Sequence, residues 1–116
     1  MPAFTRMVDI TDERRPAPVG SFQVDDIEGK PQQPLMTGCR QPCEKVTGTE
    51  IPCARFSHGL RIVDISNPHA IREDTHFMPD PPPGSDRVQS NDVTVDARGL
   101  IHVIDRLHGL TIVERA

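Results

Sequence analysis

Three cysteines near the middle of the chain are the side chains best suited to chemistry. Cys39, Cys43 and Cys53 precede His58, so four soft ligands lie within 20 residues of sequence. Zinc in proteins takes four such sulfur and nitrogen ligands in a tetrahedron. The spacing lacks the Cys-x2-Cys pair that forms the tight knuckle of many zinc sites. A metal site is therefore one of three interpretations that the spacing leaves open.

The other two interpretations use no metal. In one of them the cysteines are free thiols, two of them buried and one in a loop. In the other, Cys39 forms a disulfide with Cys43 or with Cys53. Because the number of cysteines is odd, at least one thiol stays unpaired within the chain in that case.

Histidines and catalytic motifs give fewer candidates. His58 and His108 both stand directly before a Gly-Leu pair, and this repetition favours a structural hydrogen bond at a turn. The alternative is a ring of imidazoles that binds a metal, as in copper-dependent propeller oxidases. The chain contains no dinucleotide-binding glycine motif, no P-loop, no Gly-x-Ser-x-Gly and no His-Glu-x-x-His. These absences argue against the corresponding enzyme classes.

A repeated strand is the element that must position these side chains. The segment from His58 to Pro68 is typical of one β-strand with a turn at each end. Arg6 to Thr11 matches part of it at an offset of 55 residues, and His108 to Glu114 matches it at an offset of 50. A period of about 40–50 residues with several short strands is typical of propeller blades. The sequence thus predicts an all-β fold.

Two kinds of residue recur at fixed places in this repeat. Gly59 and Gly109 open equivalent strands, and we expect a positive φ at both. Asp9 and Asp64 end equivalent strands, and we expect them to accept hydrogen bonds from turn amides. All four residues are therefore predicted to be structural.

Apolar alternation and turn residues divide the chain into nine predicted strands. They cover residues 4–10, 18–24, 43–47, 50–56, 59–65, 71–78, 91–96, 100–105 and 110–114. We expect antiparallel four-stranded blades of an incomplete β-propeller, about two blades plus a half-blade. The single domain, 1–116, then comprises the outer half of a blade (1–24), a long loop (25–42), a complete blade (43–78), a Pro-rich connector (79–90) and a last blade without its outer strand (91–116).

The segment from Gly59 to Pro68, Gly-Leu-Arg-Ile-Val-Asp-Ile-Ser-Asn-Pro, resembles the repeat of the LVIVD-repeat β-propeller family. Residues 91–106 resemble the start of a further blade, and the likeness covers 4–24 and 43–115. The resemblance implies a propeller fold in an uncharacterised family, many of whose members are bacterial and exported, and no particular activity. Cys43 departs from the family pattern, which often has His there. A ring needs 4–8 blades, so we interpret the chain as the C-terminal part of a longer propeller or a truncated reading frame.

Propellers generally bind ligands at the mouth of the central channel, where the innermost strands begin. In the predicted blades, Asn91 and Asp92 start one innermost strand, and Glu44 lies at the matching place in the other. The pattern favours turn capping as the role of these three side chains. The alternative is that they contact a ligand at the mouth of the channel.

Composition restricts the partners of the chain. The formal net charge is −4, and Arg14-Arg15 is the only adjacent basic pair, so we expect no nucleic-acid partner. No apolar run approaches the ~20 residues of a membrane-spanning helix. The first residues include no apolar signal region, and the compartment stays open.

These observations predict a non-catalytic binding or interaction scaffold without a cofactor. Its expected partners are the remaining propeller blades or further copies of the chain, together with a small molecule or protein that the sequence does not identify. The alternative is part of a metal-dependent propeller hydrolase or oxidase whose site is completed by missing blades. A structural surface-repeat protein is a third possibility.

Overall fold

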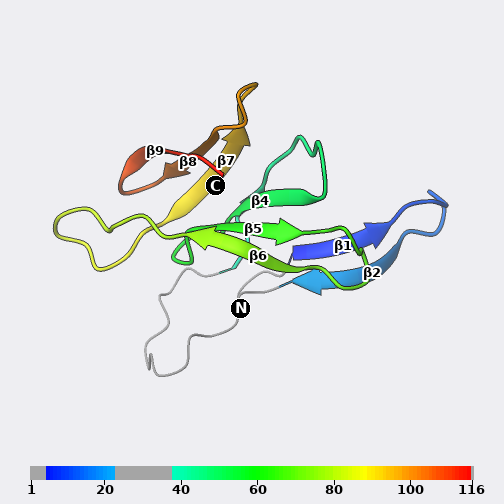
Figure 1. Cartoon of the computed structure of the whole chain (residues 1–116). Coiled ribbons are helices and arrows are strands. Elements are labelled where there is room, and N and C mark those ends of the chain that lie inside the picture. The colour runs from blue at the N-terminus through cyan, green and yellow to red at the C-terminus, as the bar shows by residue number, and fades with distance from the viewer. Residues whose placement is uncertain (1–4, 23–37, 116) are drawn as a thin grey trace.

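The structure, a computed structural model, describes residues 5–22 and 38–115 (Figure 1). The predicted loop at 25–42 falls mostly outside these described residues, as does Phe4. The described residues form strands and turns only, and none of them forms a helix long and apolar enough to cross a membrane.

Within the described residues, nine antiparallel strands form three sheets. The strands are β1 (Thr5–Asp9), β2 (Ala17–Phe22), β3 (Gln41–Pro42), β4 (Glu50–Ala54), β5 (Leu60–Asp64), β6 (Arg72–Phe77), β7 (Ser90–Val95), β8 (Ile101–Asp105) and β9 (Gly109–Val113). The first sheet is β1-β2, the middle sheet is β3-β4-β5-β6 and the last sheet is β7-β8-β9. The predicted all-β fold is confirmed, with two, four and three strands, whereas no sheet among the described residues closes on itself.

The predicted strand at 43–47 is wrong. The structure instead pairs Gln41 and Pro42 with the end of β4. One further bond of this ladder forms, from the Cys43 amide to the Pro52 carbonyl, at 2.8 Å. Residues paired in this way normally exchange two N–H···O bonds, and Pro52 has no N–H with which to return the second. The ladder therefore ends at Cys43, and β3 is only two residues long.

The repeat in the sequence is also a repeat in strand register. Every residue pair between β1 and β2 recurs between β5 and β6 at an offset of 55, so that Thr5↔Phe22 corresponds to Leu60↔Phe77. The register shift recurs as well, between Met7 and Val8 and again between Ile62 and Val63. Two sheets thus contain the same irregular hairpin.

A second register repeat links the middle and last sheets. The pairing of β4 with β5 recurs between β8 and β9 at an offset of 50, so that Ala54↔Leu60 corresponds to Ile104↔Leu110. The first and last sheets therefore each contain part of the pairing pattern of the middle sheet.

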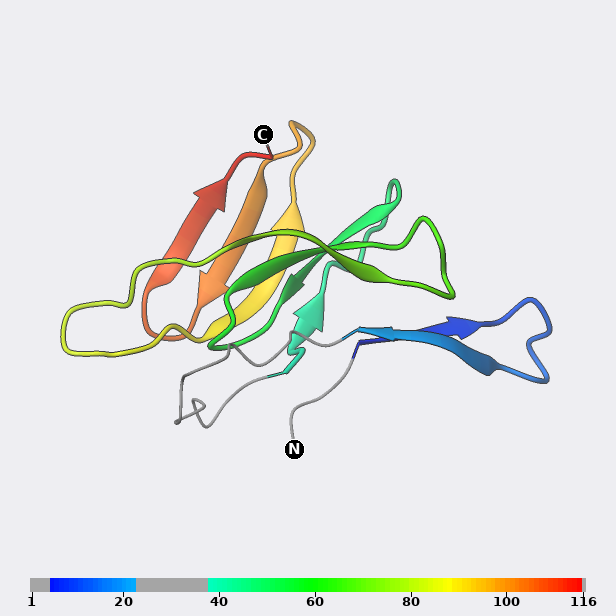
Figure 2. The same cartoon turned by 60° about the horizontal axis from the view of Figure 1, so that its bottom comes forward.

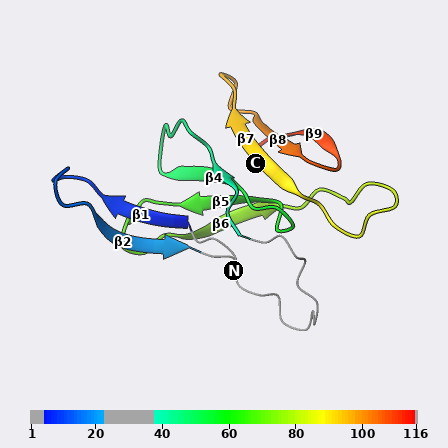
Figure 3. The same cartoon turned by 180° about the vertical axis from the view of Figure 1, so that it is seen from behind.

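The middle sheet lies between the other two (Figure 2), and the same order is seen from the front and from behind (Figure 1, Figure 3). One apolar cluster joins it to the first sheet and includes Phe22, Cys53, Val63 and Ile71. A second cluster joins it to the last sheet and includes Leu60, Ile62, Val93, Ile101 and Val103. Because side chains alternate along a strand, adjacent residues Ile62 and Val63 belong to opposite clusters.

Candidate functional site

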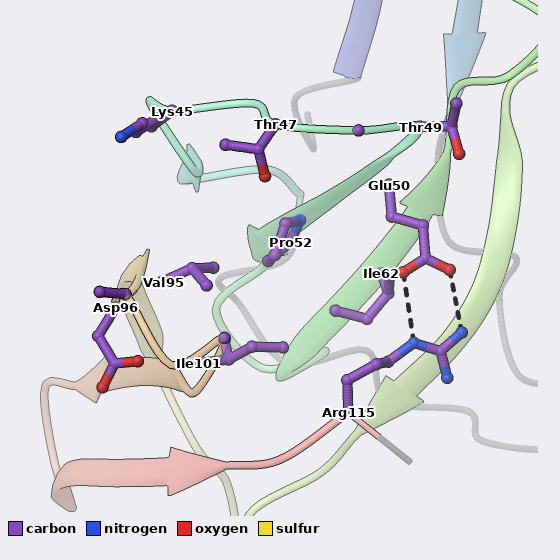
Figure 4. A pocket seen from close by; sticks show the side chains of 13 residues that line it. Lys45, Thr47, Thr49, Glu50, Pro52, Ile62, Val95, Asp96, Ile101 and Arg115 are labelled. Atoms are coloured by element: carbon purple, nitrogen blue, oxygen red, sulfur yellow. Dashed lines mark hydrogen bonds and ion pairs between the residues drawn. The ribbon is translucent and has the colours of Figure 1, made fainter.

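A groove of about 670 Å³ opens between the middle and last sheets (Figure 4). Its lining comes from residues 45–52, from Ile62, from residues 95–101 and from Arg115. Its lining combines apolar side chains such as Ile62 with charged side chains such as Arg115. An apolar lining with a few polar groups is typical of binding sites.

Arg115 lies at one end of the groove and connects three strands (Figure 4). Its Nη2 and Nε donate to the two carboxylate oxygens of Glu50, at 3.0 and 3.3 Å, and Nη2 also contacts Asp74. The hydrogen bond from Arg115 lowers the pKa of Glu50, and the same contact raises the pKa of Arg115. Arg115 thereby ties the end of β9 to β4 and β6.

Asp96 lies at another edge of the groove, in the turn between β7 and β8. It accepts hydrogen bonds from the backbone amides of Arg98 and Leu100, at 2.9 and 3.1 Å, and its Oδ2 lies 3.1 Å from His102 Nε2. The contact with His102, followed by that with the Arg98 side chain, lowers the pKa of Asp96. This carboxylate is already satisfied by its own turn, so it stabilises the hairpin.

The predicted metal ligands are not assembled into one site. Cys43 belongs to the cluster facing the last sheet, whereas Cys53 belongs to the cluster facing the first sheet, with Cys39 packed beside it. His58 is buried in the turn after β4, where its carbonyl accepts a hydrogen bond from Arg61 Nε at 2.8 Å. No three His, Cys, Asp or Glu side chains in residues 5–22 and 38–115 are placed to hold a metal ion. All three cysteines are free thiols.

The predicted ligand contacts are engaged locally or exposed. Asn91 Oδ1 accepts a hydrogen bond from Arg106 Nε at 2.9 Å, and Asp92 Oδ1 accepts one from the amide of Val93 at 2.8 Å. Glu44 is exposed, and no hydrogen bond joins it to either residue within the described part of the chain. Contact of these three side chains with a ligand stays a prediction.

The glycines and aspartates that recur in the repeat lie in turns, as the sequence predicts. Gly59 and Gly109 have φ of +68° and +94°, in the left-handed region that favours glycine. Asp9 Oδ1 accepts a 2.8 Å hydrogen bond from the Thr11 amide, and Asp64 Oδ1 does the same for Ser66. Hydrogen bonds from the Thr11 hydroxyl and then the Thr11 amide lower the pKa of Asp9, and the bond from the Ser66 amide lowers the pKa of Asp64.

Two buried arginines were missed by the sequence reasoning, because arginine is mostly exposed in proteins. Arg61 is central to β5, and its Nη1 forms an ion pair of 2.9 Å with Glu73 on β6. Arg55, directly after β4, has no solvent exposure at all. The apolar residues on both sides of Arg61 in the repeated strand were the available signal.

Together these features define an all-β protein of three packed antiparallel sheets, related by a repeated register, with an open groove between two of them. No known protein family, curated protein or solved structure matches this chain.

Proposed function

We propose that this chain is a non-catalytic segment of an LVIVD-type β-propeller, acting as a scaffold whose two outer faces bind further blades of the same repeat. One observation carries the proposal. Leu110 and Ile112 on the last sheet are 58 % and 52 % exposed, whereas their repeat equivalents Leu60 and Ile62 on the middle sheet are 1 % and 4 % exposed. These positions are thus buried in the middle sheet, where a neighbouring sheet covers them, and exposed in the last sheet.

The opposite end of the stack has the complementary open face. Val8 and Ile10 of the first sheet correspond to Val63 and Ile65 of the middle sheet at the 55-residue offset. Val63 and Ile65 pack against the first sheet, while Val8 and Ile10 are exposed. We call the face with Val8 and Ile10 the back face.

The face with Ile104, Leu110 and Ile112 is the forward face. Both existing interfaces pack the forward face of one sheet on the back face of the next, since Ile62 contacts the last sheet and Val63 contacts the first. A further blade would continue this stacking at either end. Burying a Leu or Ile side chain contributes about 1.5–3 kcal/mol, so covering three of them is strongly favourable.

The groove supports a binding role over a catalytic one. Its carboxylates are engaged with Arg115 and with turn amides, and no lining side chain forms a nucleophile–base pair. The small molecule or protein that a complete propeller would bind is not identified by these residues.

The experiment compares two charge substitutions on the last sheet. Ile112→Lys lies on the forward face, and Leu107→Lys lies in the β8–β9 turn, where Leu107 is 45 % exposed. Sedimentation velocity at micromolar concentrations measures the assembly of each variant. We expect wild type and Leu107→Lys to form oligomers, and Ile112→Lys to shift toward monomer because a charge cannot be buried in an apolar interface.

The proposal predicts equal far-UV circular dichroism for the two variants, which excludes unfolding as the cause. A wild-type chain that is a sharply melting monomer at these concentrations would contradict the proposal. So would equal losses of assembly in Ile112→Lys and Leu107→Lys, since only the former lies on the forward face.

A further inference from the structure

Two of the three thiols lie together between the first and middle sheets. Cys53 on β4 is fully buried, and Cys39, just before β3, is partly exposed and packs against the same apolar cluster. The Cys53 thiol donates a hydrogen bond to the Ile51 carbonyl at 3.7 Å. Cys43 lies on the other face of the middle sheet, where its Sγ is 3.5 Å from the Lys45 carbonyl. The chain therefore contains one thiol pair and one isolated thiol.

A buried guanidinium lies beside the pair. Arg55 directly follows β4, and its charge interacts with both Cys39 and Cys53. Arg55 Nη1 donates to Thr5 Oγ1 at 2.8 Å, and its guanidinium lies 5.1 Å from the ring centre of Phe22. Its Nε and Nη2 are buried and have no hydrogen-bond partner among residues 5–22 and 38–115.

A buried cation needs a nearby negative charge to offset its desolvation. The carboxylate that interacts with Arg55 belongs to Glu73, and Glu73 is already paired with Arg61 and His76, at 2.9 and 3.1 Å. A thiolate at Cys39 would supply the second negative charge. Arg55 thus favours the ionised form of Cys39, the thiol of the pair that solvent reaches.

The titration of the two thiols agrees with this geometry. The neighbouring Cys53 thiol lowers the pKa of Cys39 to about 6, with help from Thr5 and the charge of Arg55, although burial opposes the shift. The same interaction and burial raise the pKa of Cys53. The pair therefore favours ionisation at Cys39, the thiol that solvent reaches. A partly exposed thiolate next to a second thiol is the arrangement of peroxide-reactive cysteines.

We propose that Cys39 and Cys53 form a peroxide-reactive dithiol site, in which Cys39 attacks a hydroperoxide and Cys53 resolves the product into an intrachain disulfide. The inference stands independently of the proposed scaffold role. It assigns a substrate class, hydroperoxides, to a site that neither the groove nor the outer faces include.

The reaction proceeds in two balanced steps. First, the Cys39 sulfur bonds to one peroxide oxygen while the O–O bond breaks, and the departing oxygen takes a proton to leave as water or an alcohol. Second, the Cys53 sulfur attacks the Cys39 sulfenic acid, the S–O bond breaks, and hydroxide leaves with the Cys53 proton as water. The two thiols lose two electrons in total, and the peroxide gains them.

Tryptic mapping tests the proposal directly, because Arg40, Lys45 and Arg55 place the three cysteines in three different peptides. The full-length chain is treated with equimolar hydrogen peroxide, free thiols are then alkylated, and the digest is analysed without reduction. We expect a linked pair of peptides containing Cys39 and Cys53, and an alkylated Cys43. At pH 7, iodoacetamide should modify Cys39 about tenfold faster than Cys43, with a midpoint near pH 6.

Cys43→Ala is the matched control and should give the same disulfide. Cys39→Ser should remove it, leaving both remaining thiols free. In Cys53→Ala, whose melting is checked because Cys53 is buried, dimedone should trap a sulfenic acid on Cys39. Disulfides that involve Cys43 as often as Cys53, disulfides only between chains, or a Cys39 no faster than Cys43 would each overturn the proposal.

Discussion

Ile112 occupies in the last sheet the position that Ile62 occupies in the middle sheet, yet Ile112 is 52 % exposed and Ile62 only 4 %. Both residues lie on the forward face of their sheets and pair with the residue of the preceding strand in the same register. The last sheet covers Ile62, whereas no sheet of the described residues covers Ile112. An interface of this kind joins the forward face of one sheet to the back face of another. The same contact can therefore form repeatedly between successive copies of the chain.

The first prediction uses this directionality. Val8→Lys disrupts the back face and Ile112→Lys disrupts the forward face, so each variant alone should be largely monomeric. A 1:1 mixture should form a dimer and nothing larger, because one intact forward face meets one intact back face and both remaining faces carry lysine. Sedimentation velocity distinguishes the species. A mixture that stays monomeric while wild type assembles would show that assembly is not head-to-tail.

The second prediction compares two repeat glycines. A Cβ at Gly59 would lie 2.7 Å from the Phe77 carbonyl oxygen, whereas a Cβ at Gly109 would meet nothing within 4 Å. Gly109→Ala should lose about 1–2 kcal/mol of unfolding free energy from the left-handed backbone alone. Gly59→Ala should lose about 3 kcal/mol or more, because the clash adds to that strain. Urea denaturation measures both, and equal losses would show that the clash is relieved by movement of β6.

The third prediction concerns the contact between the first and middle sheets. A Cβ at Gly20 would lie 2.3 Å from the carbonyl oxygen of Pro68, while a Cβ at Gly48 would meet nothing within 4 Å. Gly20→Ala should destabilise the chain by about 1–3 kcal/mol, as overpacking commonly does. Gly48→Ala is the control and should stay within about 0.5 kcal/mol of wild type. Hydrogen exchange of the β1 and β2 amides should rise only in Gly20→Ala if the two sheets separate.

The fourth prediction is a pH dependence of stability. The pKa of Asp96 is lowered in the fold, first by His102 and then by Arg98. A carboxyl group with a lowered pKa stabilises the fold above its unfolded pKa near 4, and this contribution disappears as the pH falls below about 4. Asp96→Asn should therefore flatten the loss of stability between pH 5 and 3, measured as urea midpoints.

Much of the fold could be predicted from the sequence because the repeat is local. The strands containing Val8, Val63 and Val113 share one pattern of β-branched residues and turn residues, and this pattern alone gives sheets of two, four and three strands. The ends of these strands follow from residues such as Asp64 and Pro68, whose turn preferences act over a few positions. The position of β3 was predicted wrongly, because it depends on which residues pair with Pro52 and its neighbours. No local sequence pattern specifies that pairing.

The candidate sites were less predictable, because they depend on which face of a strand meets which neighbour. The spacing of Cys39, Cys43, Cys53 and His58 allowed one four-ligand site, but sheet packing places Cys43 in the cluster facing the last sheet and the other two cysteines in the cluster facing the first. Sequence alone determined the strand repeat and the residues at its turns, since those follow from backbone preferences. Only the tertiary structure decided that Arg55 is buried beside a thiol pair and that Ile112 is exposed, because burial depends on contacts between residues far apart in the chain.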